Sequence, residues 1–188
     1  MNQEIYTREK TLWTVLIPQM ILMVISILWI CLVPGDNIAR YLKFNLQALF
    51  IGSVTGVSLS FLGYVFYKWA KRKKRFLETI ELFENVLSPA FKNFRIIEII
   101  LLSLVSGFCE EIFFRGLLQP KFGILIASLA FGSLHLPGLK YWIYALWATL
   151  SGALFGLFFI LANSLWFPIT AHAVNNIMGM ILLTKVKK

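Results

Sequence analysis

Long apolar runs alternate with short polar segments along the whole chain. A helix needs about 20 apolar residues to cross the hydrocarbon core of a bilayer. Six runs approach or exceed that length, at 12–33, 42–67, 96–118, 122–136, 141–161 and 166–184. The fourth is short and is closed by Pro137 and Gly138. The pattern predicts an all-α fold: a polytopic membrane bundle of about six transmembrane helices.

The segment 76–91 has a different pattern, in which apolar and polar side chains recur at helical spacing. The apolar positions are Phe76, Ile80, Phe83 and Leu87. The polar positions are Glu78, Glu81, Glu84 and Asn85. A helix with two such faces is typical of one that lies in the membrane interface, and Pro89 is expected to end it.

Lysine and arginine are distributed unevenly between the two sides that six spans would define. One side holds Arg8, Lys10, the basic residues between Lys68 and Arg95, Lys140, Lys185, Lys187 and Lys188. The other side holds Arg40, Lys43 and Lys121. Cytoplasmic segments carry the excess of positive charge, so both termini are expected in the cytoplasm of a multi-pass protein, in the plasma membrane of a bacterium.

No polar stretch is long enough to form a second unit. We therefore expect one membrane domain, 1–188, with two N-terminal spans at 11–67, a basic cytoplasmic segment at 68–95 and a core at 96–184. Glycine pairs at 52/56 and 152/156 predict close helix contacts.

Composition agrees with a membrane protein. The chain is 59% hydrophobic and 14% charged, with a mean hydropathy of +0.76, whereas soluble domains are about 25% charged. The net charge of +9 comes largely from residues beside the spans, which favours contact with membrane lipid over nucleic acid. Cys31 and Cys109 lie in apolar runs and form no disulfide framework.

The stretch FCEEIFFRG, at 108–116, places charges inside an apolar span. The ionisable residues within the membrane are Glu110, Glu111, Arg115, His135 and His172. Each charge at mid-membrane costs about 2.5–3.5 kcal/mol on insertion scales, so such a cluster predicts a functional site.

Helical spacing divides these residues into groups. Glu111 and Arg115 are four apart and are expected to pair, while Glu110 is turned by about 100° and is left over. Two further pairs have the same spacing, Phe131 with His135 and His172 with Asn176. Burying these polar stripes against one another is the least costly arrangement in lipid.

Several kinds of chemistry fit this set. Glu110 as general base and His135 as its partner would activate water, with His172 and Asn176 stabilising an oxyanion. Alternatively, Glu110, His135 and His172 would bind zinc, although no HExxH motif supports this. Two other hypotheses are that the cluster forms a proton relay in a transporter, or that the Glu–Arg pair is purely structural.

Three motifs in this order resemble one family. EEIFFR at 110–115 fits E-E-x-x-x-R, FGSLH at 131–135 fits F-x-x-x-H, and HAVNN at 172–176 fits H-x-x-x-N. Together they are similar to the CAAX protease and bacteriocin-processing (Abi) family of intramembrane proteases, related to the type II CAAX prenyl endopeptidases. The resemblance covers about residues 96–184.

The resemblance implies a helical membrane core with an endopeptidase site, and a peptide or membrane protein as substrate. Glu110 and His135 would activate water, His172 and Asn176 would bind the oxyanion, and Glu111, Arg115 and Phe131 would support the site. We expect no cofactor, with zinc as the alternative. A non-catalytic immunity or scaffold protein of the same fold is the second hypothesis.

The six predicted spans place Glu110 and His135 at different depths in the membrane, although a shared site requires the same depth. With 1.5 Å per residue, Glu110 lies about 21 Å from the cytoplasmic start of its span, but His135 lies at the inner end of a short span. The difference is about 10 Å by the same rise. A tilted helix, or one that ends within the membrane, would remove it.

Overall fold

The computed structural model describes residues 7–33 and 38–185. Every element in these ranges is helical, which confirms the predicted all-α class. The elements are α1 (Arg8–Leu32), η2 (Ile38–Leu42), α2 (Leu46–Ala70), η3 (Lys74–Phe76), α3 (Leu77–Glu81), η4 (Leu82–Leu87), α4 (Ser88–Phe91), α5 (Ile96–Glu111), η5 (Ile112–Leu118), α6 (Gln119–Leu134), η6 (Leu139–Tyr141), α7 (Trp142–Ala162) and α8 (Trp166–Thr184). Lys187 and Lys188 lie outside the described residues.

Four of the six predicted spans are long and apolar enough to cross a membrane: α1, α2, α7 together with η6, and α8. The other two are present as helices but differ from regular spans. The third consists of α5 and the π-helical η5, and contains Glu110, Glu111 and Arg115. The fourth, α6, is interrupted near its start by Gly123, whose φ of 84° turns the chain back.

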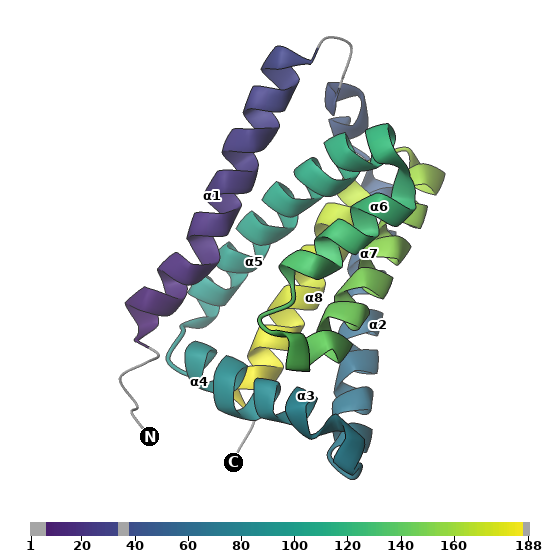
Figure 1. Ribbon diagram of the computed structural model, residues 1–188. Helices are drawn as coiled ribbons and strands as arrows, with labels where there is room; N and C mark the ends of the chain where they lie inside the picture. The colour runs from purple at the N-terminus through teal and green to yellow at the C-terminus, as the bar shows by residue number, and fades with distance from the viewer. Residues whose placement is uncertain (1–6, 34–37, 186–188) are drawn as a thin grey trace.

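Helix α8 lies in the middle of the bundle (Figure 1) and packs against α2, α5 and α7. Helix α1 stands at one side, against α5 and η5. Helix α6 runs obliquely across the bundle and packs on α7. Of the helices that carry predicted site residues, α5 and α8 thus pack against each other, and α6 packs on η5, which continues α5.

Glycines allow the closest helix contacts. A Cβ added at Gly52 would lie 2.5 Å from the Phe167 carbonyl oxygen, and one at Gly56 would lie 2.5 Å from the Ala171 carbonyl oxygen. Both distances are shorter than van der Waals contact, so α2 can approach α8 this closely only with glycine at these positions. The predicted close contact of the 52/56 pair therefore lies within one chain.

The segment from η3 to α4 crosses one end of the bundle (Figure 1). Lys71 Nζ contacts Glu84 Oε1 at 2.6 Å, and this hydrogen bond raises the pKa of Lys71. Lys140 Nζ contacts Glu81 Oε1 at 2.9 Å, and Arg8 pairs with Glu98. The starts of α1, α5 and α7 thus lie at the same end as the basic segment.

The buried face of this segment differs from the predicted one. Phe76 is buried, but Ile80, Phe83 and Leu87 are only half-buried, whereas Leu82 is 1% exposed. A π-helix has more residues per turn than an α-helix, so η4 does not keep the spacing on which the expected face depends.

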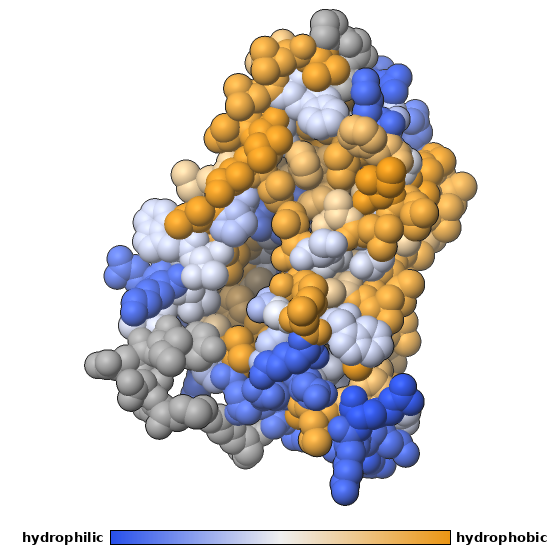
Figure 2. All heavy atoms as spheres, viewed as in Figure 1, coloured by the Kyte–Doolittle hydropathy of each residue, from blue (hydrophilic) through white to orange (hydrophobic). Residues whose placement is uncertain are grey.

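The surface agrees with a membrane setting. Figure 2 shows hydrophilic side chains gathered at the end where α3 and α4 lie, and apolar side chains over most of the rest of this face. Helices α1 and α2 expose large apolar residues along their length, such as Met20, Val24, Phe50 and Phe61. Apolar surface this extensive is typical of a face that contacts lipid.

Candidate active site

The two adjacent carboxylates of α5 lie in different surroundings. Glu111 is fully buried, and its carboxylate is 2.9 Å from Arg115 Nη1. Glu110 is 6% exposed and does not pair with Arg115. Consecutive helical residues point about 100° apart, so one carboxylate faces the interior of the bundle and the other a cavity.

Arg115 connects two further helices to Glu111. Its Nη2 donates to the Gly152 carbonyl of α7 at 3.0 Å, and its guanidinium lies 4.4 Å from the centre of the Phe131 ring of α6. A Cβ at Gly152 would lie 2.8 Å from Nη2, so glycine is required for this contact. The Phe131 ring also lies beside the His135 ring, with centroids 4.5 Å apart.

Glu111 also binds His172 of α8, with 2.7 Å between Oε1 and Nδ1. An ionised carboxylate can only accept a hydrogen bond, so Nδ1 of His172 donates. Its Nε2 carries a second hydrogen only if the ring is an imidazolium, whose charge Glu111 would offset. His172 is 3% exposed and stacks on Phe155.

Glu110 contacts residues from two other helices. Gln19 Nε2, on α1, donates to Glu110 Oε1 at 2.7 Å. His135 Nε2, at the end of α6, is 3.8 Å from Glu110 Oε2. His135 Nδ1 is 2.8 Å from the Phe131 carbonyl, which can only accept, so in a neutral ring Nε2 has a lone pair. Two acceptors thus face each other at a distance that suits one bridging water.

The depth difference between Glu110 and His135 is absent in the structure. After α5 and η5 have crossed most of the bundle, the chain reverses at Gly123, and α6 ends at Leu134 with His135 as its C-cap. Because α6 is short and oblique, it ends beside Glu110 rather than at the far surface (Figure 1).

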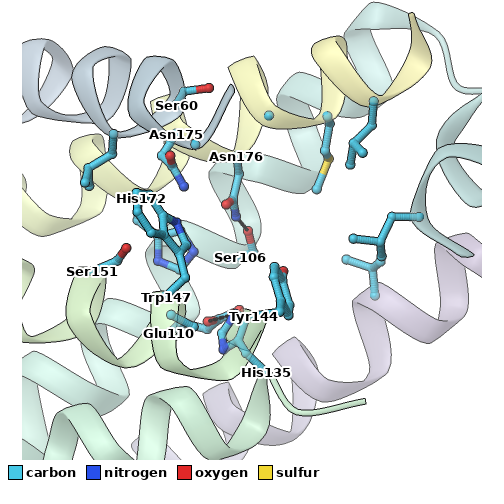
Figure 3. A pocket seen from close by; sticks show the side chains of 18 of the residues that line it. Ser60, Ser106, Glu110, His135, Tyr144, Trp147, Ser151, His172, Asn175 and Asn176 are labelled. Atoms are coloured by element: carbon cyan, nitrogen blue, oxygen red, sulfur yellow. Dashed lines mark hydrogen bonds and ion pairs between the residues drawn. The ribbon is translucent and has the colours of Figure 1, made fainter. Parts of the chain in front are cut away.

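These side chains line a cavity of about 490 Å³, within the ordinary size range of a ligand site. Figure 3 shows Glu110, His135 and Tyr144 together, with His172 and Trp147 next to them and Asn175, Asn176 and Ser60 further along. The cavity continues between the ends of α1, α2 and α8 toward η4 and α4, where its lining includes Thr14, Tyr67, Phe83, Leu87 and Leu183. Figure 2 shows the surface hollowed between α1 and α6.

Asn176, on α8, is hydrogen-bonded to a serine of α5 that the sequence motifs do not include. Its Nδ2 donates to Ser106 Oγ at 3.0 Å, and Ser106 lies one turn before Glu110 on α5 (Figure 3). The second hydrogen of Nδ2 is left for another acceptor.

The structure therefore brings the predicted residues Glu110, Phe131, His135, His172 and Asn176 to one cavity, with Glu111 and Arg115 behind it. Sequence reasoning missed Gln19, Ser106 and Tyr144. A signal for Gln19 was present, since an amide side chain follows Pro18 within an otherwise apolar run.

The zinc alternative requires Glu110, His135 and His172 to converge as ligands. Within 7–33 and 38–185, no group of three His, Cys, Asp or Glu side chains is arranged to hold a metal ion. His172 Nδ1 and Glu110 Oε1 are each engaged by another side chain.

The fold and the cavity define a helical membrane protein with a carboxylate–histidine site. Residues 92–178 match the family model for type II CAAX prenyl endopeptidase Rce1-like proteins. This match confirms the sequence resemblance over residues 92–178. In this segment the chain is similar to membrane proteins of the CAAX protease type.

One curated relative is the uncharacterized protein YpbD of Bacillus subtilis (strain 168). It is 38% identical over 84 residues, which are 45% of this chain and 44% of that protein. The chain thus matches less than half the length of this relative. No solved structure matches the chain.

Replacing Glu111 by Gln should lower the yield of folded protein. The change leaves Arg115 buried without its ion pair, and breaking such a pair costs about 3–5 kcal/mol. Thermal unfolding in detergent, with Glu111→Gln beside the double variant Glu111→Gln, Arg115→Met, measures this. The double variant should recover stability, and a single variant as stable as the unaltered protein would contradict the pairing.

Proposed function

We propose that this protein is a membrane-embedded endopeptidase in which Glu110 and His135 activate a water molecule. The observation that carries the proposal is the pair of acceptors, Glu110 Oε2 and His135 Nε2, 3.8 Å apart at the wall of the cavity. A water that donates one hydrogen to each acceptor directs its oxygen lone pairs into the cavity. A peptide carbonyl placed there would meet a nucleophile.

Proton transfers follow from this placement. The water oxygen attacks the carbonyl carbon while Glu110 takes a proton, acting as general base. The tetrahedral intermediate then breaks its C–N bond, and the proton held by Glu110 passes through His135 Nε2 to the leaving amine. The products are a new carboxyl terminus and a new amino terminus.

His172 and Asn176 would stabilise the oxyanion of that intermediate. As an imidazolium held by Glu111, His172 can donate from Nε2, and Asn176 has an amide hydrogen beyond the one given to Ser106. Donors fixed before the reaction stabilise a developing charge without reorganisation. Glu111, Arg115 and Phe131 keep His172 and His135 in place.

The substrate would be a peptide or a membrane protein that reaches the site from lipid or from the end covered by η4 and α4. Residues that line the cavity extend to that end. The basic segment at 68–95 lies there as well, and would face the cytoplasm together with both termini.

Substituting Glu110 by Gln should abolish peptide cleavage, because an amide keeps the shape but is not a base. The measurement is turnover of a peptide library by purified protein in detergent. Glu78→Gln, a substitution at an exposed glutamate on α3, serves as the matched control and should retain activity. Normal function of the Glu110→Gln protein would instead favour the immunity or scaffold hypothesis.

Cleavage should persist after exhaustive treatment with chelators, with no stoichiometric zinc found by elemental analysis. In this metal-free mechanism His172→Ala removes one oxyanion donor and should lower kcat by about 10²–10³-fold without eliminating it. If activity disappears with chelator and returns with Zn²⁺, Glu110, His135 and His172 are ligands and the proposed mechanism is wrong.

Orientation can be tested by reporter fusions after Arg75, after Lys188 and after Phe44. The first two should report the cytoplasm and the third the opposite side, since the excess of positive charge lies with the first two. An external reading after Arg75 would place the mouth of the cavity on the outer side.

A further inference from the structure

Gln19 is a polar residue of α1 that the reaction described above does not use. Helix α1 exposes apolar side chains such as Met20, Ile21 and Val24, yet Gln19 is 7% exposed and points to the bundle. Its Nε2 lies 2.7 Å from Glu110 Oε1, across 91 positions of sequence. A buried amide with an apolar helix around it costs free energy unless it is hydrogen-bonded.

The contact fixes the rotation of the Glu110 carboxylate. The terminal torsion of a glutamate is broad, so a carboxylate without a partner rotates freely. Among the described residues, Gln19 is the side chain that donates a hydrogen bond to Glu110. With Oε1 held by Gln19, Oε2 is the oxygen directed toward His135 Nε2.

Gln19 lies outside the segment that matches the Rce1-like family, which begins at residue 92. Helix α1 is nevertheless placed firmly, because it packs on α5, η5 and α4, and Arg8 near its start pairs with Glu98 of α5. These contacts set the height of Gln19 opposite Glu110.

We propose that Gln19 is a positioning residue for the general base Glu110, so that α1 completes the active site formed by residues 92–178. This inference rests on the proposed function. Gln19 would act on Glu110 and not on the substrate, so its loss should change the rate of the chemical step more than substrate binding.

The test is Gln19→Met, which keeps the volume and removes the donor. We expect kcat to fall by about 10–100-fold, as for loss of a hydrogen bond to a charged group, and KM to change by less than about twofold.

Gln119→Met is the matched control. Gln119 is a buried glutamine too, and its Nε2 donates to the Gly156 carbonyl at 2.9 Å, away from the cavity lining. This variant should lose stability but keep kcat. If Gln19→Met lowers stability to the same extent and leaves kcat in place, Gln19 is structural and the inference is overturned.

The two proposals fail in different ways. Cleavage by the unaltered protein and none by Glu110→Gln supports the proposed function, and the Gln19→Met result then decides the role of Gln19. No cleavage by the unaltered protein overturns the proposed function, and with it the positioning role.

Discussion

The site depends on the hydrogen bonds made by the carboxylate of Glu111, which has no exposed surface. This carboxylate accepts from Arg115 of η5 and His172 of α8, and Arg115 in turn donates to the Gly152 carbonyl of α7. One anion therefore fixes segments from three parts of the chain. In a low-dielectric interior an unpaired partner is strongly unfavourable, so the arrangement is maintained or lost as a whole.

Such short bonds require backbones that approach closely, and small residues make this possible. A Cβ at Gly107 of α5 would lie 3.0 Å from the Ala173 nitrogen of α8. Glu111 lies about one turn after Gly107 on α5, and His172 directly precedes Ala173 on α8. The close approach of the two backbones therefore lets Glu111 Oε1 and His172 Nδ1 meet at 2.7 Å. In lipid, where apolar side chains gain little from helix association, this packing is a main source of affinity between helices.

The helices and the core of the site could be predicted from the sequence, because both depend on local spacing. Apolar run length predicts spans, and four-residue spacing predicts the Glu111–Arg115 pair. The contact of Gln19 with Glu110 could not be predicted this way, since it depends on how α1 packs against α5, and isolated polar residues in spans are common. The reversal at Gly123, which brings His135 to Glu110, and the π-helical geometry of η4 and η5 are likewise not encoded in hydropathy.

Glu110 and Glu111 differ in how each is compensated, and this difference suits the proposed chemistry. Glu111 is paired with the Arg115 guanidinium and is fully buried behind the cavity. Glu110 is held by an amide, which orients one oxygen without neutralising the carboxylate. The second oxygen of Glu110 has no hydrogen-bond partner in the described part of the chain. That oxygen is therefore free to accept a hydrogen bond from water, as the proposed reaction requires.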